Sequence, residues 1–305
     1  MKKTYHLCLS AGNEIIFRNQ EDYNRAFNIF ALALYKTNST GLVEAFMSTH
    51  CHLMVQTEDP AGFMYAFRQP YSKYFNRKYC REGLLGEKCH FQLEVIGVYH
   101  LLAAMSYVLR NPLHHGVAPI PYAYPHSSAN VIFQKEMGKS PTERLLPRKS
   151  FYKFIGRHAE YPAYYKMSED GVFLRETVLD VRQVENIYIS PRSFDYYMNR
   201  KTCEDWDKEQ LKDNDTAVTI RLEDIESGIK LQSLDIMLKN ESGRLNYKNI
   251  SDIELCTEVD KKILSRYDKS SVYLLTMREQ QEIAEYLANT LHVGAAQIKR
   301  CLNML

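Results

Sequence analysis

The order of two hydrophobic periodicities in the first 110 residues constrains the fold of this chain more than any other feature. Stretches in which apolar residues alternate, as in strands, are separated by longer stretches with the helical spacing of three or four. The expected strands are 4–10, 42–48, 52–57 and 90–98, and the expected helices are 21–37, 61–80 and 99–110. This β-α-β-β-α-β-α order predicts an α+β fold, a four-stranded antiparallel sheet with helices on one face, in the ferredoxin-like (split βαβ) arrangement.

Two prolines are expected to interrupt these helices. Pro70 lies inside helix 61–80, where a missing N–H and a bulky ring should kink or split the helix. Pro112 follows Asn111, and this pair is expected to end helix 99–110.

The chain is expected to have three parts. The proline-rich stretch "APIPYAYPHSSAN", from residue 118 on, places the end of the first domain near residue 135. Residues 136–200 are expected to form a basic and aromatic linker region, and residues 201–305 a mostly helical C-terminal domain. At 305 residues the chain is long enough for two domains or more.

Composition places the chain among ordinary globular proteins, with 45% hydrophobic and 25% charged residues. No apolar run is long enough to cross a membrane, and the N-terminus lacks the apolar core of a signal peptide. The seven cysteines include no C-x-x-C pair, which argues against a disulfide framework and against a four-thiolate zinc site. We therefore expect a cytoplasmic protein, and a net charge of +2 leaves a local basic surface open.

Two histidines one residue apart stand in the stretch "AFMSTHCHLMVQT". On a strand, His50 and His52 would point the same way, about 7 Å apart, while Cys51 points into the core. That geometry can hold one metal ion. Taken alone the pattern is weak, because structural or surface histidines are the commoner explanation of such a pair.

A second pattern strengthens the first. In "MSYVLRNPLHHGV", Tyr107 and Asn111 are four residues apart and therefore share a helix face. Together with the histidine pair this resembles the HUH-type single-tyrosine transposases, and more closely the REP-associated tyrosine transposases. The landmarks of that family stand here in the family's order: "YHLCLSAGN", "MSTHCH", "YFNRKY", "HFQ", "YVLRNPLHHGV" and "YPHSSA". The resemblance covers roughly the first 135 residues.

The resemblance implies a chemistry for this chain. Tyr107 would be the nucleophile, and His50, His52 and Asn111 would hold a divalent metal ion, Mg²⁺ or Mn²⁺. It implies a metal-dependent single-stranded DNA endonuclease and strand transferase, acting on hairpin DNA as a monomer or homodimer in the bacterial cytoplasm, in association with the nucleoid. The phenol of Tyr107 must then lie beside the ion rather than be buried in the interior.

The sequence departs from the family at two places near this site. Ser48 and Thr49 replace the proline and asparagine that usually precede the first histidine, and "QLEV" replaces "Q-G-R-F" at 92–95. The proposed ligands and the tyrosine are retained. We therefore expect the cleavage chemistry to be retained and the affinity or specificity for DNA to differ.

Basic residues supply candidate DNA contacts in three segments. They are Lys73, Arg77 and Lys78 on helix 61–80, Arg148, Lys149, Lys153 and Arg157 among the aromatic residues of 144–166, and Lys299 and Arg300 in a possible helix-turn-helix at 276–305. The alternatives are solvated faces for the first segment, aromatic anchors packed on a neighbouring domain for the second, and a plain two-helix hairpin for the third.

Other interpretations remain open at this stage. The chain could be a catalytically silent DNA-binding regulator derived from such a transposase. An RNA-binding module of the ferredoxin-like kind would instead need exposed aromatic residues on the sheet face. Among the 22 tyrosines, Tyr71, Tyr74 and Tyr79 are weaker candidates for the nucleophile, because their spacing is more typical of packing against the sheet.

Overall fold

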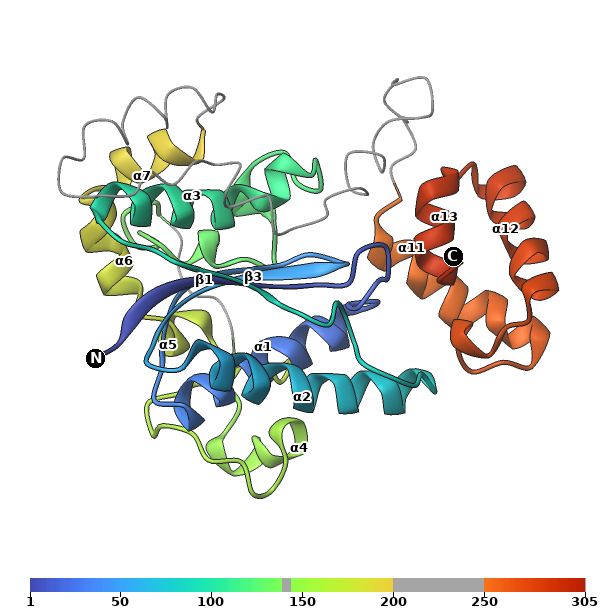
Figure 1. Ribbon diagram of the computed structural model, residues 1–305, viewed down its shortest axis with the longest axis horizontal. Coiled ribbons are helices and arrows are strands. Elements are labelled where there is room, and N and C mark those ends of the chain that lie inside the picture. The colour runs from blue at the N-terminus through green and yellow to red at the C-terminus, as the bar shows by residue number, and fades with distance from the viewer. Residues whose placement is uncertain (139–143, 200–249, 305) are drawn as a thin grey trace.

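A four-stranded antiparallel sheet forms the centre of the computed structural model, which describes residues 1–138, 144–199 and 250–304 (Figure 1). Its strands are β1 (Lys3–Ser10), β2 (Thr40–Phe46), β3 (His50–Thr57) and β4 (Phe91–Glu94). They lie in the order β2-β3-β1-β4, and each neighbouring pair is antiparallel. The predicted α+β class and four-stranded antiparallel sheet are confirmed.

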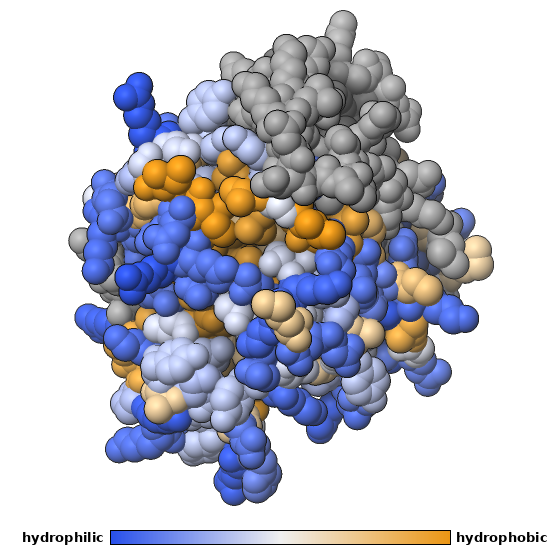
Figure 2. Space-filling view, turned by 60° about the vertical axis from the view of Figure 1, so that its left-hand side comes forward, coloured by the Kyte–Doolittle hydropathy of each residue, from blue (hydrophilic) through white to orange (hydrophobic). Residues whose placement is uncertain are grey.

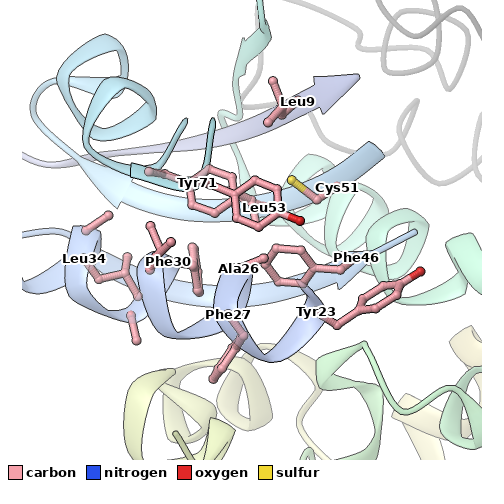
Figure 3. Packing of buried hydrophobic residues seen from close by; sticks show 14 of the residues in the cluster. Leu9, Tyr23, Ala26, Phe27, Phe30, Leu34, Phe46, Cys51, Leu53 and Tyr71 are labelled. Carbon is pink, nitrogen blue, oxygen red and sulfur yellow. The ribbon is translucent and has the colours of Figure 1, made fainter. Parts of the chain in front are cut away.

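Helices α1 (Gln20–Lys36) and α2 (Pro60–Tyr79) cover one face of this sheet, shown below it in Figure 1. Asn19 starts α1 with a capping box, accepting a hydrogen bond from the N–H of Asp22 while the Asp22 carboxylate accepts one from the N–H of Asn19. The core between the helices and the sheet is rich in aromatic rings, which Figure 3 shows packed around Phe30 and Phe46. Burial of these rings is the main stabilising contribution on this face.

Helix α3 (Val98–His114) lies on the opposite face, together with α6 (Val181–Tyr188) and α7 (Pro191–Met198) (Figure 1). The prediction that the helices lie on one face is therefore wrong. Val43, Ala45 and Met54 are apolar and point to this second face, so it also needs a cover. Strands that are apolar on both sides indicate a sheet buried on both faces.

Both prolines lie inside their helices, so the predicted split at Pro70 and the predicted helix end at Asn111–Pro112 are wrong. Helix α2 runs through Pro70 without interruption, and α3 continues through Pro112 to His114. A proline inside a helix costs about 3 kcal/mol. In α2 that cost is offset because Phe63, Phe67 and Phe75 are fully buried, each contributing about 1.5–3 kcal/mol.

Residues 144–199 pack against both faces. They contain the short helices α4 (Tyr152–Ile155) and α5 (Arg175–Val178) besides α6 and α7. Phe173 joins the core beneath α1, and Phe194 joins the core around α3. The predicted linker segment thus contributes buried side chains to the cores of the sheet, and boundaries at 135 and 200 stay predictions.

The described C-terminal residues, 250–304, form a helical unit with its own apolar core. Its helices are α11 (Asp252–Glu258), α12 (Met277–Leu291) and α13 (Ala295–Leu302). Thr276 and Glu279 form the predicted capping box of α12. Arg18, 1% exposed, joins this unit to the sheet domain: its guanidinium pairs with Asp260 at 2.7 Å and donates to the carbonyl of Cys301 at 2.8 Å. The part of the predicted helical domain at 201–249 lies outside the described residues.

Short turns complete the described chain. They are 3₁₀ turns at Pro121–Ala123, Ser128–Asn130, Arg148–Ser150, Leu264–Tyr267 and Val272–Leu274, and a π turn at Val259–Ile263.

The surface mixes hydrophilic regions with one apolar band, which Figure 2 shows on the face drawn there. Exposed large apolar side chains include Ile96 and Val98, which flank Gly97 at the start of α3. Within the described parts of the chain, no helix is both long and apolar enough to span a bilayer.

Candidate metal and tyrosine site

Strand β3 places His50 and His52 on the α3 face of the sheet. Between them, Cys51 points to the α1–α2 face, where it packs with Leu53 (Figure 3). The strand begins at His50 itself, because Met47 closes the preceding turn by donating its N–H to the carbonyl of His50 at 2.7 Å. The predicted alternation of the two histidines and the cysteine is confirmed.

Asn111, on α3, lies between the two imidazoles. Its Oδ1 is 3.2 Å from Nε2 of His50, and its Nδ2 is 3.1 Å from Nε2 of His52. An amide nitrogen only donates and an amide oxygen only accepts. Nε2 of His52 therefore accepts from Asn111, and Nε2 of His50 donates to it. The three predicted ligands thus meet at one point between strand and helix.

The other ring nitrogens of the histidine pair also have partners. Thr49 Oγ1 lies 3.1 Å from Nδ1 of His50. On the neighbouring strand β1, His6 Nε2 lies 3.0 Å from Nδ1 of His52, and the two rings are stacked with centroids 5.2 Å apart. Both imidazoles are thereby fixed in rotation, with their Nε2 atoms directed at Asn111.

Tyr107 stands one helical turn before Asn111 on α3. Its ring centroid is 5.4 Å from that of His52 and 6.0 Å from that of His6. The expected proximity of phenol and imidazoles is therefore present. The expected accessibility is not, because Tyr107 is only 3% exposed and the three predicted ligands are 0–2% exposed. A phosphodiester cannot contact these atoms unless the surrounding chain moves.

Burial keeps the imidazoles of this site neutral. It lowers the pKa of His50 to about 4 and that of His6 to about 3, and with the neighbouring imidazoles it lowers the pKa of His52 well below its usual range. A neutral imidazole is the form that can bind a metal ion. Proton release is thus no obstacle to metal binding near neutral pH.

The spacing of the ligand atoms is compatible with a small cation. Two ligands about 2.1 Å from one octahedral ion and at right angles to each other are about 3 Å apart. The distance from Oδ1 of Asn111 to Nε2 of His50, 3.2 Å, is close to this value, whereas His52 faces Nδ2 of the same amide, which is not a ligand atom. Among the described residues, no group of three or more His, Cys, Asp or Glu side chains could hold a metal ion. A metal would thus depend on two imidazoles and one amide.

A pocket of about 660 Å³ adjoins the site. It includes His115, whose ring centroid lies 5.5 Å from that of His50. Apolar residues such as Met47 and Tyr124 line most of it, and Ser48 and Asp252 line its edge toward the C-terminal unit. Ser48 donates its hydroxyl to Asp252 at 2.7 Å, so the loop before the two histidines is joined to that unit.

The predicted DNA contacts on α2 lie on the other side of the sheet from the site. Lys73 and Arg77 are exposed there. Lys78 is paired with Glu21 at 2.8 Å and with Asp22 at 2.7 Å, so its charge is already neutralised within the protein. The sheet separates these three residues from Tyr107, so they are not part of the same site.

The basic and aromatic segment at 144–166 is partly packed. Phe151 and Tyr165 are buried in the core beneath α1, which favours the interpretation as packing anchors for these two rings. Its basic side chains Arg148, Lys149, Lys153 and Arg157 are exposed. The guanidinium of Arg148 lies 4.8 Å from the ring centre of Tyr161 and that of Arg157 lies 5.8 Å from that of Tyr152. Their DNA contacts stay predictions.

Helix α13 does not present its predicted DNA-facing residues together. Lys299 is exposed, whereas Arg300 is 2% exposed and pairs with Asp252 at 3.5 Å. Gln297 also donates to Asp252, at 3.0 Å. The prediction that Arg300 faces DNA is wrong for this conformation, because its guanidinium is used inside the protein.

The other candidate tyrosines are engaged on the α1–α2 face. Tyr71 is buried and donates its hydroxyl to the carbonyl of Ile16 at 2.5 Å. Tyr74 and Tyr79 both donate to Asp22, and burial followed by this carboxylate raises the pKa of each phenol. These contacts support packing roles.

Sequence reasoning assigned no role to three residues that complete the site. His6 had a signal, as the histidine of the "YH" motif, but pattern alone did not pair it with His52. Thr49 was noted only as a departure from the family, and His115 only as part of "LHHGV". These residues reach the site only because β1 pairs with β3 and because α3 ends at His114, and local sequence patterns specify neither feature.

Comparisons with known proteins add a distant structural relationship. No protein-family model matches the sequence, and no curated protein matches it. Among solved structures, the chain is similar to a REP-associated tyrosine transposase bound to a REP hairpin. The identity is 13%, the match covers 46% of this chain and 84% of that chain, and the TM-score is 0.37. We therefore argue function from the side chains of this chain.

Proposed function

We propose that this protein is a metal-dependent single-stranded DNA endonuclease and strand transferase that acts through Tyr107 on hairpin DNA, built on a ferredoxin-like HUH core. The observation that carries the proposal is the meeting of His50, His52 and Asn111 within hydrogen-bond distance, with the Tyr107 ring against His52. The strand order β2-β3-β1-β4 agrees with the ferredoxin-like arrangement.

The proposed reaction is a reversible phosphoryl transfer. The Tyr107 oxygen attacks the scissile phosphorus in line, a bond forms between them, and the bond from phosphorus to the 3′ oxygen breaks. The phenol loses its proton and the leaving 3′ oxygen gains one, so the products are a free 3′-hydroxyl and a 5′-phosphotyrosyl link. Attack by another 3′-hydroxyl on that link restores the tyrosine and joins two strands.

A divalent cation would be held by Nε2 of His50, Nε2 of His52 and the amide oxygen of Asn111. When bound, it would polarise the phosphate and offset the negative charge that develops during transfer. Imidazole ligands suit Mn²⁺ better than Mg²⁺, which prefers oxygen ligands and water. Within the protein, α3 aligns Tyr107 with Asn111, and β3 supplies the two imidazoles from the facing strand.

Tyr107→Phe tests the proposal, because it removes the attacking oxygen and leaves the ring packed against His52. The wild-type protein, with a labelled single-stranded hairpin library and Mn²⁺, is expected to form a protein-linked oligonucleotide whose adducted peptide contains residue 107. The variant is expected to bind the same DNA and form no adduct. Tyr71→Phe on the other face is the matched control and should retain adduct formation. An adduct on another residue, or one that persists in Tyr107→Phe, contradicts the assignment.

The burial of Tyr107 favours a second candidate, a catalytically silent DNA-binding regulator. At 3% exposure the phenol has no open approach for a substrate strand. The same experiment separates the two functions. The enzyme forms the adduct, which requires that DNA binding opens the site, whereas the regulator binds hairpin DNA and leaves it intact at every metal concentration.

A further inference from the structure

His6 contacts the proposed metal ligand His52 directly, and this inference therefore rests on the proposed function. It lies on β1, fully buried, with its Nε2 atom 3.0 Å from Nδ1 of His52. The ring planes are inclined by only 24°, so the two hydrogen-bonded imidazoles are nearly parallel. The edge-on contact with Tyr107, at 6.0 Å between ring centroids, also brings His6 against the proposed nucleophile.

The direction of the hydrogen bond between the two histidines follows from Asn111. The amide nitrogen of Asn111 can only donate, so Nε2 of His52 must accept it across 3.1 Å. A neutral imidazole carries one proton, which in His52 must then be on Nδ1. Nδ1–H of His52 donates to Nε2 of His6, and His6 acts as an acceptor.

This arrangement prepares His52 for a cation. A histidine binds a metal through an unprotonated nitrogen, and the partner of its other nitrogen decides which nitrogen that is. With Nδ1–H held by His6, the lone pair of Nε2 faces Asn111, where the ligand atoms converge. His50 differs: its Nε2 carries the proton that Asn111 accepts, and it must change tautomer to bind the ion. The hydroxyl of Thr49 can serve either tautomer, because it both donates and accepts.

His6 occupies its position at a cost to stability. If Nε2 accepts from His52, the proton of His6 is on Nδ1, and this buried atom has no hydrogen-bond partner among the described residues. An unsatisfied buried donor costs about 1–3 kcal/mol. A leucine there, between Phe91 and Tyr107, would carry no such donor, and Nδ1–H of His52 would then be the group that loses its partner. A residue that breaks a packing rule without local compensation indicates a functional position.

We propose that His6 is a positioning residue that holds His52 in its Nδ1–H tautomer and so presents Nε2 to a divalent cation.

Two variants of the full chain test the role of His6. His6→Leu exchanges one unsatisfied buried donor, Nδ1–H of His6, for another, Nδ1–H of His52, so the protein should fold with thermal stability close to that of the wild type. His6→Gln can place its amide oxygen near the position of Nε2 and should still accept from His52. With Mn²⁺ alone as the probe, calorimetry on DNA-free protein should show affinity about 10–100-fold lower for His6→Leu. His6→Gln should remain close to the wild-type protein.

Ring-nitrogen NMR of metal-free protein labelled with ¹⁵N-histidine reads the tautomer directly. The expected wild-type result is a protonated Nδ1 and an unprotonated Nε2 in His52, with loss of this single tautomer in His6→Leu. A wild-type His52 protonated on Nε2 overturns the proposal. So does unchanged Mn²⁺ affinity in His6→Leu, or a wild-type protein that binds no Mn²⁺.

The same measurements separate this role from the proposed function. If His6 sets the tautomer and the Mn²⁺ affinity but the wild-type protein forms no phosphotyrosyl adduct, the positioning role is supported and the proposed function fails. If the adduct forms and His6→Leu leaves Mn²⁺ affinity unchanged, the positioning role alone is overturned.

Discussion

The two faces of β3 are built from different chemistry on the same eight residues. On the α1–α2 face, Cys51, Leu53 and Val55 pack into a core dominated by aromatic rings (Figure 3). On the α3 face, His50 and His52 meet other imidazoles and an amide, although they are buried as fully as the apolar residues opposite. The depth of burial is the same, but the two imidazoles on the α3 face have hydrogen bonds and a protonation state that must be satisfied, whereas Cys51, Leu53 and Val55 need only complementary packing.

The difference shows what a buried polar cluster requires. An apolar side chain needs only complementary shape, whereas each imidazole nitrogen needs a partner of the correct kind. On the α3 face these partners come from β1, from the turn before β3 and from α3, as His6, Thr49 and Asn111. Several elements must therefore be correctly placed together before this face gains stability, and it should respond to perturbation differently from the aromatic face.

Lowering the pH should produce the largest loss of folding stability, and the histidines on the α3 face should account for most of this loss. Burial lowers the pKa of His6 to about 3, of His50 to about 4 and of His115 to about 2, and lowers that of His52 further below its usual range. His126, stacked on Tyr23, has its pKa lowered to about 3. The unfolded chain protonates these groups near pH 6.5 and the folded chain does not, so stability is present above that pH and is lost as the pH falls.

The expected loss between pH 7.5 and pH 5 is about 2 kcal/mol for each of these histidines, of order 10 kcal/mol in all as an upper bound. That is comparable with the whole stability of a typical domain. Urea denaturation of metal-free protein at both pH values measures it. His6→Leu should make the dependence shallower by about one proton, whereas Phe67→Leu should lower stability equally at both pH values. A flat profile would show that the imidazoles are not buried as described.

A cavity in the aromatic core on the α1–α2 face should produce the second largest loss of stability. Phe67 is fully buried on α2 and packs edge-on against Phe30 and Phe46. Phe67→Ala is expected to reduce the free energy of unfolding by about 3–5 kcal/mol, from lost burial and the cavity left behind. Phe67→Leu, which keeps most of the volume, should cost considerably less.

The same variants test whether the two faces are independent. Mn²⁺ affinity per folded molecule should be unchanged in Phe67→Leu, because residue 67 touches none of the proposed ligands. A large fall in Mn²⁺ affinity with intact folding would show that the aromatic core positions the site through the sheet.

The sequence predicted the elements of the sheet domain well because their patterns are local. Alternation of apolar residues indicated β1 and β3, and apolar residues at helical spacing indicated α1. The predicted split at Pro70 and helix end at Pro112 were wrong, because tertiary burial outweighed a local penalty. The α3 face was missed because whether a helix returns over the second face depends on the packing of distant segments such as α6 and α7.

The candidate site could be predicted in part for the same reason. His50 and His52 share a face by strand geometry, and Tyr107 and Asn111 by helix geometry, so each pair was visible in sequence. The partner of His52 was not, because Cys8, rather than His6, is directly opposite His52 in the register of β1 and β3, and His6 reaches it diagonally. The pairing of Arg300 with Asp252 and of Lys78 with Asp22 could not be predicted, because a basic residue on a helix gives no local sign of a buried carboxylate partner.

Loss of the Thr49 hydroxyl should produce the smallest loss of stability. It tests a single hydrogen bond on the α3 face. Thr49 is buried, and its Oγ1 lies 3.1 Å from Nδ1 of His50. Thr49→Val keeps the shape of the side chain and removes this hydrogen bond, so the free energy of unfolding should fall by about 1 kcal/mol. Mn²⁺ affinity should fall about tenfold, as for other partners that orient metal ligands.

Thr49→Ser is the matched control, because it restores the hydroxyl and should recover most of the affinity and stability. Urea denaturation and Mn²⁺ calorimetry on the same preparations separate the two effects. If the affinity falls in Thr49→Val but not in Thr49→Ser, the hydroxyl orients His50 as a ligand. If both variants lose stability and neither loses affinity, Thr49 contributes only to packing, and the two imidazoles are oriented without help from the turn that precedes β3.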